Sequence, residues 1–281
     1  FGRLRVSRET HLAGVMGWPV EHSLSPKLHS FWLKDLGIRG QYLPLAVQPK
    51  DLARALWSLR ALGFRGVNVT VPHKEHAIHL VDEVSPVALR IGAVNTITVG
   101  EDGSLHGTNT DAFGFVQNLR AGAPGWQPGR PSLVIGAGGA ARAVCVGLLE
   151  VGAAEVRVCN RTRDRSDELA RAIDGNVLAV DWSDREAAVE EAGLLVNTTT
   201  LGMQGSGPLP MSLARLPMDA VVTDIVYVPL KTPLLTAAKS RGNIVVDGLG
   251  MLLYQAQPGF SSWFGQQPKV TPAVRSHLSS G

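Results

Sequence analysis

The sequence predicts an α/β protein with two domains, each built on a mostly parallel sheet that helices cover. Three observations lead to this class. Short apolar runs alternate with helical patterns along most of the chain, and a segment rich in Gly and Pro at residues 121–131 interrupts the alternation. The length of 281 residues fits two domains, since about 150 residues per domain is typical.

The first part of the chain joins strand and helix patterns by short links. In chain order we expect a strand at 12–17, a helix at 26–36, a strand at 41–47, a helix at 49–62, a strand at 66–71, a hairpin at 93–99 and 104–107, and a helix that opens at Asp111. Glu101-Asp102-Gly103 has the composition of the hairpin turn. Because strands alternate with helices, the first sheet should be mostly parallel.

The alternation restarts after residues 121–131, which indicates a second sheet. Its strands are expected at 132–135, 155–160, 177–180, 194–197, 220–225 and 244–246. The closing stretch from Leu249 to Phe264 has a helical pattern that Pro258-Gly259 should interrupt.

Composition excludes several classes of protein. With 44% apolar and 18% charged residues, the chain can bury sizeable cores and is not disordered. The net charge of +3 is small and scattered, which argues against nucleic acid as a partner. Cys145 and Cys159 lie in apolar stretches without metal-ligand spacing, so no metal site and no disulfide framework are expected. No apolar run is long enough for a membrane helix. We therefore expect a cytoplasmic protein without a membrane partner.

The strongest local signal is a glycine-rich turn between an apolar run and a helical pattern, at residues 133–142. In it, Gly136 permits a tight turn, Gly138 lets the backbone approach a pyrophosphate, and Ala141 is small enough for helix–strand packing. The N-terminus of the following helix attracts that anion. An ordinary tight turn also uses glycines, but the strand before and the helix after favour a Rossmann-like dinucleotide-binding domain.

The end of the next strand favours NADP over NAD. An acidic residue that binds the ribose hydroxyls of NAD is typical at this position, but here it is Asn160. Arg161, Arg163 and Arg165 surround it, and a guanidinium suits a 2′-phosphate. An exposed basic turn that opens a helix is the alternative, and it fits less well because cations are disfavoured at a helix N-terminus.

Polar residues in the first domain allow both structural and functional interpretations. Ser25 suits the N-cap of a helix with Pro26 at its first position, whereas two hydroxyls, Ser23 and Ser25, at a helix N-terminus also suit a carboxylate. Lys74 emerges at a strand end as either a solvated charge or a site residue, and its neighbours His73 and Glu75 are expected at the surface.

Two further polar segments stay open in the same way. Asp111 is either a helix cap or a carboxylate that holds the Lys74 ammonium. The segment Asn197-Thr198-Thr199 ends a strand, where it either lines a ligand crevice or forms a plain turn.

Taken together and in order, these motifs resemble those of shikimate dehydrogenases, NADP-dependent enzymes that reduce 3-dehydroshikimate to shikimate in aromatic amino-acid biosynthesis. The resemblance runs from about Leu12 to about Gly265. The matching motifs are Ser-Leu-Ser-Pro at 23–26, Asn-Val-Thr-Val-Pro-His-Lys at 68–74, Gly-Ala-Val-Asn-Thr at 92–96, Asn-Thr-Asp at 109–111, the glycine loop at 136–140, Asn-Arg-Thr at 160–162, and Asp-Gly-Leu-Gly-Met-Leu at 247–252.

The resemblance implies roles for individual residues. Lys74 and Asp111 would be the catalytic acid/base pair. The residues implied in substrate binding are Ser23, Ser25, Thr70, Lys74, Asn95, Asp111, Tyr227 and Gln255. The residues implied in binding NADP (NADPH) are Gly136, Ala137, Gly138, Gly139, Ala140, Asn160, Arg161, Thr162, Arg165, Ile225 and Gly248. Thr200 and Tyr254 depart from the usual family pattern near the nicotinamide pocket.

The resemblance also sets the expected domain limits. Residues 1–120 would form the substrate-binding domain, residues 121–247 the NADP-binding Rossmann domain, and residues 248–281 a helical segment that returns to the first domain, with a cleft between the two domains. The expected assembly is a monomer or a homodimer. A quinate/shikimate or aminoshikimate dehydrogenase of the same fold is the alternative activity. A non-catalytic ligand-binding regulator is the alternative of another class, and the retention of both Lys74 and Asp111 argues against it.

Overall fold

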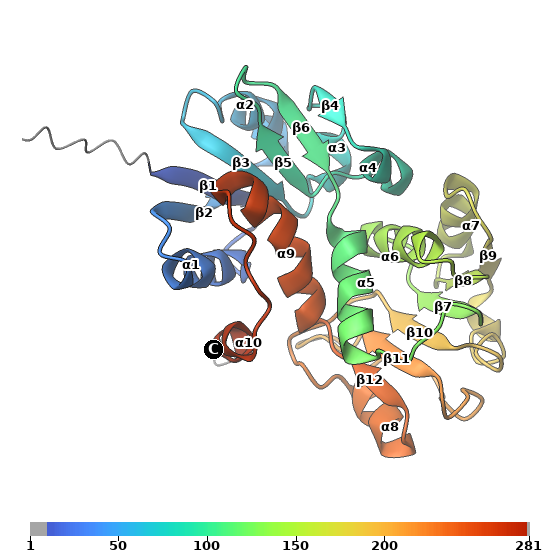
Figure 1. The fold of residues 1–281 in the computed structure, drawn as a ribbon. Helices are drawn as coiled ribbons and strands as arrows, with labels where there is room; N and C mark the ends of the chain where they lie inside the picture. Colours follow the sequence, from blue (N-terminus) through green and yellow to red (C-terminus); the bar gives the residue numbers. More distant parts are fainter. Residues whose placement is uncertain (1–9, 280–281) are drawn as a thin grey trace, which may run out of the picture. The chain divides into compact units, whose positions relative to one another are not determined.

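Two six-stranded sheets organise the chain, and each sheet belongs to its own unit (Figure 1). The computed structural model describes residues 10–279. The first unit consists of residues 1–89, 93–110 and 256–281, and the second of residues 90–92 and 111–255. The α/β class with mostly parallel sheets is confirmed. The functional domain limits at residues 120 and 247 stay a prediction.

The sheet of the first unit has the strand order β2-β1-β3-β5-β6-β4. Its strands are β1 (His11–Gly17), β2 (Gly40–Ala46), β3 (Phe64–Val69), β4 (Glu83–Val84), β5 (Thr96–Val99) and β6 (Leu105–Thr108). Strands β2, β1 and β3 are parallel, β5 is antiparallel to both β3 and β6, and β4 is parallel to β6. Consequently β5 alone runs against the other described strands of this sheet, and the expected hairpin is present as β5–β6.

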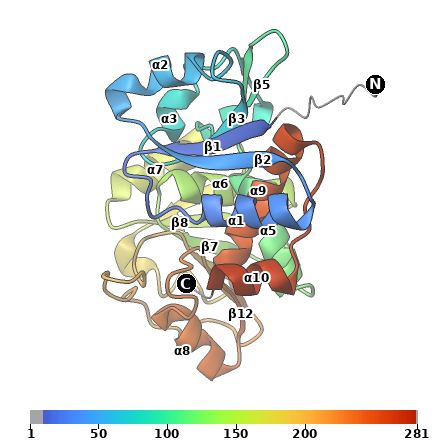
Figure 2. The ribbon, with the colours of Figure 1, turned by 90° about the vertical axis from the view of Figure 1, so that its left-hand side faces the viewer.

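Helices cover both faces of this sheet. The helices of this unit are α1 (Ser25–Asp35), the 3-10 turn η1 (Pro49–Asp51), α2 (Leu52–Trp57), α3 (Lys74–Ala77), α4 (Pro86–Ile91) and α10 (Pro272–Ser279), which packs against α1. Figure 2 shows α2 and α3 on one face of β1 and β2, and α1 on the other. Because side chains alternate along a strand, Met16, Val67 and Val69 join the core under α2, together with Leu52 and Leu56.

The expected helix at residues 49–62 is shorter in the structure. A 3-10 turn leads into α2, which ends at Trp57. The Ser58 hydroxyl bonds back to the carbonyl oxygen of Arg54 at 2.8 Å, a local bond that competes with helix continuation. The chain then passes through turns to β3, and the Phe64 N–H donates to the carbonyl oxygen of Leu59 at 2.9 Å.

The sheet of the second unit is fully parallel, with the strand order β12-β11-β10-β7-β8-β9. Its strands are β7 (Ser132–Ile135), β8 (Val156–Cys159), β9 (Val177–Val180), β10 (Leu194–Asn197), β11 (Val221–Asp224) and β12 (Ile244–Val246). Counted within this unit, the order is that of the Rossmann fold, whose strand order reverses between its first and fourth strands. Those strands are β7 and β10, so a ligand crevice is expected at their carboxyl ends.

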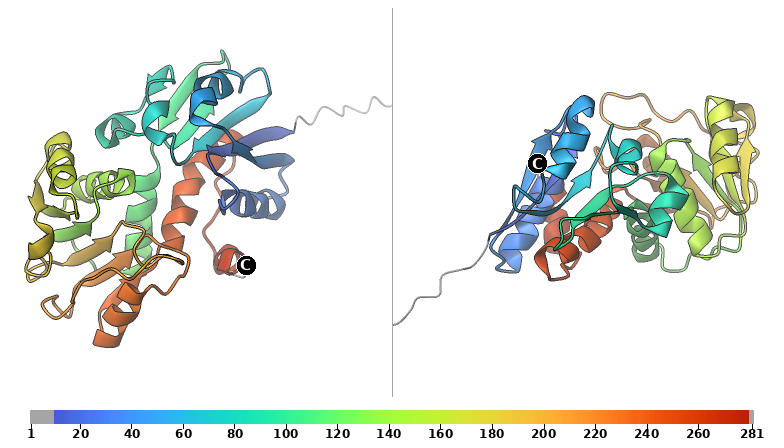
Figure 3. Two further views of the ribbon diagram at one scale, coloured as in Figure 1. Left: turned by 180° about the vertical axis from the view of Figure 1, so that it is seen from behind. Right: turned by 90° about the horizontal axis from the view of Figure 1, so that it is seen from above.

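Helices of the second unit also lie on both faces of its sheet. They are α5 (Asp111–Gly122), α6 (Gly139–Glu150), α7 (Arg163–Ala172), the 3-10 turn η2 (Trp182–Asp184) and α8 (Pro233–Arg241). Helices α5 and α6 lie side by side (Figure 3). The opposite face is packed by α8 through Leu234 and Leu235, which join Leu133, Leu195 and Val222 in one apolar core.

Helix α9 (Leu249–Phe264) continues through Pro258, where an interruption was expected. Proline removes one helical hydrogen bond and strains the preceding turn, and here a tertiary contact holds the part of the helix beyond it. The Trp263 indole N–H donates to the carbonyl oxygen of Ile97 at 3.0 Å, and Trp263 packs against Gly259. Within residues 10–279, no helix has the length and apolarity needed to cross a membrane.

Candidate functional site

One edge of the first sheet gathers most of the residues expected to bind substrate. Since β1, β3 and β6 point the same way and β5 runs against them, the carboxyl ends of those three strands meet the amino end of β5. Register pairs Met16 with Val69, Asn68 with Thr96, and Thr96 with Thr108. The segments that leave this edge carry Ser23, Ser25, Thr70, Lys74 and Asn95.

A buried hydrogen-bond network holds Asn95 at this edge. The Tyr42 hydroxyl donates to Asn68 Oδ1 at 2.6 Å, and Asn68 Nδ2 donates to Thr96 Oγ1 at 3.0 Å. Thr96 Oγ1 in turn donates to Asn95 Oδ1 at 2.9 Å, and the Thr110 N–H donates to the same oxygen at 2.9 Å. Burial raises the pKa of the Tyr42 phenol well above 10, so Tyr42 stays a hydroxyl donor. The orientation of Asn95 is therefore fixed by residues behind it.

Lys74 is the first residue of α3, and its main chain is anchored on both sides. The Lys74 carbonyl oxygen accepts a bond from the Val94 N–H at 2.9 Å. The preceding residue, His73, is fully buried, and its Nε2 lies 2.7 Å from the carbonyl oxygen of Val47. Because a carbonyl only accepts, Nε2 carries the hydrogen. The expectation of a surface position is wrong for His73, whereas Glu75 is exposed.

The two serines lie where β1 leads into α1, but their capping roles differ from those expected. Helix α1 begins at Ser25, Leu24 occupies the N-cap, and no side chain among the described residues caps the helix. The Ser25 N–H instead donates to Ser23 Oγ at 3.3 Å. The sequence allowed Ser25 as the cap because Pro26 suits the first helical position, yet the structure places the helix start one residue earlier. Ser25 is buried and Ser23 is half-buried.

Behind these serines lies an aromatic cluster that the sequence did not reveal. His29 is fully buried, stacks on Tyr42 with ring centroids 3.8 Å apart, and also lies against Trp32, Phe260 and Trp263. Within the described part of the chain, neither ring nitrogen of His29 has a hydrogen-bond partner. Burial lowers its pKa to about 3, which keeps the imidazole neutral. Only the helical spacing of His29 and Trp32, which puts both on one face of α1, hints at the cluster.

In the second unit, the glycine-rich turn has the geometry that a pyrophosphate needs. Gly136 follows β7 with a φ of +112°, and a Cβ there would lie 2.5 Å from Thr198 Oγ1. Gly138 is the N-cap of the twelve-residue helix α6. A Cβ placed on Gly138 or Gly139 meets no atom of the described residues within 4 Å. The turn therefore leaves open space beside a helix N-terminus, as anion binding requires.

The basic turn after β8 divides its arginines between two tasks. Arg163 pairs with Asp167 and with Asp181, each at 3.0 Å. For Arg161 and Arg165, both exposed, the described part of the chain contains no ion pair. Asn160 Nδ2 donates to the carbonyl oxygen of Thr162 at 2.9 Å and so holds the turn. Arg161 and Arg165 are therefore available to bind a phosphate, whereas the charge of Arg163 is already neutralised by Asp167 and Asp181.

Of the remaining predicted residues, Ile225 and Tyr227 follow β11, Gly248 and Gln255 follow β12, and Asp111 follows β6. The Ile225 N–H donates to the carbonyl oxygen of Asn197 at 3.0 Å. Tyr227 is half-buried, and burial raises its pKa. A Cβ on Gly248 would lie 2.3 Å from the Ile225 carbonyl oxygen, so only glycine fits. Gln255 Nε2 donates to the carbonyl oxygen of Leu252 at 3.1 Å, and Asp111, which is buried, begins α5.

The predicted residues thus divide between the units. Ser23, Ser25, Thr70, Lys74 and Asn95 belong to the first unit. The second contains Asp111, Tyr227, Gln255, Gly136, Ala137, Gly138, Gly139, Ala140, Asn160, Arg161, Thr162, Arg165, Ile225 and Gly248.

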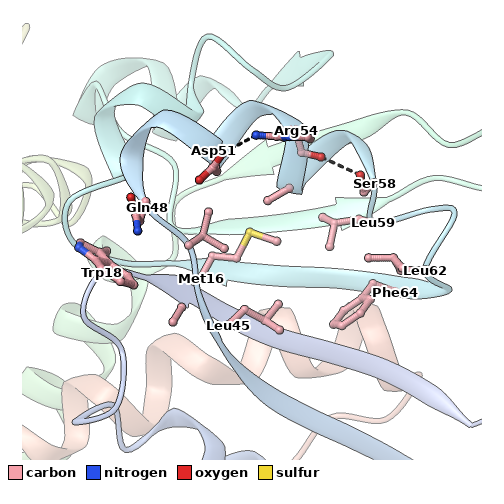
Figure 4. Close-up of a pocket in the computed structure, with 13 residues that line it drawn as sticks. Met16, Trp18, Leu45, Gln48, Asp51, Arg54, Ser58, Leu59, Leu62 and Phe64 are labelled. Atoms are coloured by element: carbon pink, nitrogen blue, oxygen red, sulfur yellow. Dashed lines mark hydrogen bonds and ion pairs between the residues drawn. The ribbon is translucent and has the colours of Figure 1, made fainter.

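A cavity of about 480 Å³ opens on the face of the first sheet under α2 (Figure 4). Apolar side chains such as Met16, Leu45 and Phe64 line it, and the Asp51–Arg54 ion pair lies over it. None of the predicted substrate or cofactor residues lines this cavity. It therefore does not account for the candidate site.

Comparison with known proteins agrees with this arrangement. Residues 15–97 match the family of shikimate dehydrogenase substrate binding domains, and residues 128–202 match the shikimate / quinate 5-dehydrogenase family. A shikimate dehydrogenase (NADP(+)) of Paramagnetospirillum magneticum is 55% identical over 276 residues, which cover 98% of this chain and all of that protein. The chain belongs to the shikimate dehydrogenase family.

Solved structures of this family share the whole fold. Shikimate 5-dehydrogenase from Thermus thermophilus, in complex with NADP(H) and shikimate, is 40% identical with a TM-score of 0.85, covering 96% of this chain and 98% of that one. Quinate dehydrogenase from Corynebacterium glutamicum, in complex with NAD, is 30% identical with a TM-score of 0.91, covering 97% and 99%. Of the two departures from the family pattern, Thr200 is exposed and Tyr254 is half-buried in α9.

Proposed function

We propose that the chain is an NADP-dependent shikimate dehydrogenase that reversibly reduces 3-dehydroshikimate to shikimate. The observation that carries the proposal is the polar edge of the first sheet, where adjacent strands present Ser23, Ser25, Thr70, Lys74 and Asn95. The match to the Paramagnetospirillum shikimate dehydrogenase (NADP(+)), which covers all of that protein, supports it. The cytoplasmic location and the monomeric or homodimeric state stay predictions.

Binding of a polar carboxylic acid follows from the donors at this edge. The hydroxyls of Ser23 and Ser25, beside the start of α1, suit the substrate carboxylate. The Thr70 hydroxyl and the Asn95 side chain suit the ring hydroxyls, and the network behind Asn95 fixes its orientation before substrate arrives. Tyr227 and Gln255 are proposed to complete the substrate contacts.

Lys74 and Asp111 are proposed as the acid/base pair. The Lys74 ammonium can donate a proton to the oxygen of the reacting carbonyl and, in the reverse direction, a neutral Lys74 can accept it. Two short links support the pairing. The Lys74 carbonyl oxygen accepts a hydrogen bond from the N–H of Val94, the residue before Asn95. The Asn95 side-chain oxygen accepts a hydrogen bond from the N–H of Thr110, the residue before Asp111. A carboxylate so placed would orient the ammonium.

The second unit is proposed to hold NADP, which supplies or accepts the hydride when bound. The open turn at residues 136–140 and the N-terminus of α6 fit the pyrophosphate. Arg161, Arg165 and the Thr162 hydroxyl fit the adenosine 2′-phosphate, while Asn160 holds their turn. Ile225 and Gly248, which contact each other, would border the nicotinamide end.

A quinate dehydrogenase is the alternative activity, and the close structural match to the Corynebacterium enzyme is the observation that favours it. The absence of an acidic residue at Asn160 argues against a preference for NAD. A non-catalytic regulator of the same fold would bind ligand but would not need both Lys74 and Asp111.

A spectrophotometric assay separates these activities. Shikimate or quinate is supplied with NADP or NAD, and the absorbance of the reduced cofactor is followed. We expect turnover with shikimate and NADP to exceed the other three combinations. Higher turnover with quinate would select the alternative enzyme, and no turnover with bound ligand would select the regulator.

Two variants test the roles within that assay. Lys74→Ala should lower turnover by about 10²–10⁴-fold with a modest change in shikimate affinity, whereas Lys34→Ala, which removes an exposed lysine of α1, should keep wild-type turnover. Near-normal turnover of Lys74→Ala would refute the catalytic assignment while leaving the substrate assignment intact.

A further inference from the structure

Asp224, the last residue of β11, is an ionisable side chain buried where the proposed function gives it no task. It is fully buried, and its carboxylate accepts three hydrogen bonds. Asn197 Nδ2 and the Val226 N–H each lie 3.0 Å from Oδ1, and the Thr232 hydroxyl lies 2.8 Å from Oδ2. Burial raises the pKa of this carboxyl, while the three donors lower it.

Asn197, the last residue of β10, extends this cluster into a second loop. Its Nδ2 donates to the Leu201 carbonyl oxygen at 2.9 Å as well as to Asp224. Its Oδ1 accepts from the Thr199 N–H at 3.1 Å and from the Thr199 hydroxyl at 2.8 Å. Both donors and both acceptor positions of the amide are therefore used, so the side chain has one orientation.

The two loops that meet at Asp224 border the proposed cofactor site at two places, one beside the Gly136 turn and the other at the nicotinamide end. The loop after β10 carries Thr198, whose hydroxyl donates to the Ile135 carbonyl oxygen at 2.7 Å and lies against the Gly136 turn. The loop after β11 carries Ile225 and Tyr227 on either side of Val226. The Val226 N–H donates a hydrogen bond to the Asp224 carboxylate. A third bond fixes Thr232, the N-cap of α8, where that loop ends.

Stability alone does not account for a carboxylate at this place. A buried ionised group is costly to desolvate, and well-packed apolar residues of similar size often stabilise a protein as well or better. The carboxylate instead fixes the positions of its partners, because it accepts hydrogen bonds from two loops and from a helix N-cap at the same time. Each loop is thereby held relative to the other at the carboxyl edge, where open sheets bind their ligands.

We propose that Asp224 is a positioning residue that, through Asn197, Val226 and Thr232, holds the two loops bordering the NADP site, one beside the Gly136 turn and one at the nicotinamide end. This inference rests on the proposed function in that it takes NADP as the ligand of the second unit. It assigns Asp224 no contact with cofactor or substrate. Its effect should appear in NADP affinity, and neither the 2′-phosphate preference nor shikimate affinity should depend on it.

The test measures the Kd of NADP and of NAD by calorimetry without substrate, together with steady-state kinetics, for four variants. Asp224→Asn keeps the size of the side chain but loses one acceptor position. Asp219→Asn is the control, since Asp219 forms an exposed pair with Arg130 in the same unit. Thr232→Val removes the hydroxyl that donates to Asp224, and Thr232→Ser retains it.

We expect Asp224→Asn to weaken NADP binding by about ten- to a hundred-fold, since bonds to charged groups contribute more than neutral ones. The ratio of NADP to NAD affinity and the shikimate KM should change by less than about threefold. Thr232→Val should weaken NADP binding in the same sense, and Thr232→Ser should restore it. Thr232→Val also loses the α8 cap, so Kd rather than Tm decides.

Three outcomes would overturn the proposal. In the first, the NADP affinity of Asp224→Asn lies within twofold of that of the Asp219→Asn control. In the second, Thr232→Val and Thr232→Ser bind NADP with equal affinity. In the third, Asp224→Asn loses affinity for NADP but not for NAD. If Asp224→Asn does not fold, the Thr232 pair decides. A wild-type protein that binds NADP but does not oxidise shikimate refutes the proposed function and leaves the Asp224 test standing, whereas one that binds no NADP refutes both.

Discussion

Asn68 lies directly behind Asn95 in the first sheet, and its side-chain amide donates to the Asn95 carbonyl oxygen at 3.1 Å. The other end of the same side chain accepts from the Tyr42 hydroxyl at 2.6 Å. Since the carbonyl of Asn95 only accepts, the amide of Asn68 has a fixed orientation, and Tyr42 must be the donor. The position of Asn95, a proposed substrate-binding residue, thus depends on Tyr42 of the edge strand β2.

Tyr42→Phe should therefore affect both stability and substrate binding. It removes the donor to Asn68 Oδ1 and leaves that buried oxygen unsatisfied, which should lower the free energy of unfolding by about 1–3 kcal/mol. The shikimate KM should rise severalfold while the Kd of NADP stays unchanged. Urea unfolding and kinetics check both effects. Ser58→Ala, which removes a local hydroxyl bond in the same unit, is the control, and an equal rise in its KM would contradict the role of Tyr42.

His29 should make stability depend on pH. Its pKa is about 3 in the folded protein and about 6.5 when unfolded. Below pH 6.5 the unfolded chain takes up a proton that the folded chain refuses, so the free energy of unfolding falls as the pH decreases towards 3. This group alone should lower the free energy of unfolding by about 1.6 kcal/mol between pH 6.5 and pH 5.

The matched variants for this prediction are His29→Phe and His79→Ala. The first keeps a ring against Tyr42 and cannot titrate, so its stability should fall less between pH 6.5 and pH 5 than that of the wild type. His79 is exposed, and its replacement should leave the wild-type pH dependence. Chemical denaturation at several pH values measures the difference, and identical slopes for wild type and His29→Phe would count against the buried neutral imidazole.

The sequence predicted the strands of the second unit and its glycine turn because both depend on local signals. Apolar runs such as Leu194–Asn197 are short and bounded by polar or Gly-rich segments, and the Gly136 turn needs a positive φ that glycine provides. Periodicity predicts a helix over residues 49–62 that is too long, because it does not register a side chain such as Ser58, which bonds back to the main chain. The sequence predicts a break at Pro258, but the helix continues because Trp263 holds the part beyond it.

The residues that the sequence missed owe their position to partners far away in the chain. His73 is buried because Val47, 26 residues earlier, accepts its hydrogen bond. His29 is buried because Phe260 and Trp263 of α9 complete its surroundings. Neither partner can be identified from spacing. Lys74 draws notice because it emerges at a strand end, whereas Asn95 is singled out only by the family resemblance, and the roles of both stay predictions. Periodicity thus finds the strand ends, and long-range packing decides which neighbours are buried there.

Arg163 should contribute little to cofactor choice although it sits between Arg161 and Arg165. Its guanidinium is engaged by Asp167 and Asp181, which raise its pKa. Arg161→Ala should weaken NADP binding by about ten- to a hundred-fold with little effect on NAD. Arg163→Ala should leave the ratio of NADP to NAD affinity within about threefold of the wild type. Calorimetric titration of both cofactors measures the ratios, and an equal loss in the two variants would show that Arg163 also reaches the phosphate.

Gly136 and Gly138 should respond oppositely to alanine. At Gly136 the φ of +112° disfavours any side chain, and a Cβ would lie 2.5 Å from Thr198 Oγ1, so Gly136→Ala should lower Tm by several degrees. At Gly138 the φ of −91° suits alanine, and a Cβ meets no atom of the described residues within 4 Å. Gly138→Ala should therefore keep Tm within about 2 °C and still weaken NADP binding about tenfold or more, because the methyl group would stand where the backbone must approach the pyrophosphate.

Thermal unfolding and NADP titration of both variants distinguish the effects. Gly152→Ala, at a φ of +87° in the turn after α6, controls for strain without a phosphate role, and wild-type NADP affinity in Gly138→Ala would show that the pyrophosphate binds elsewhere.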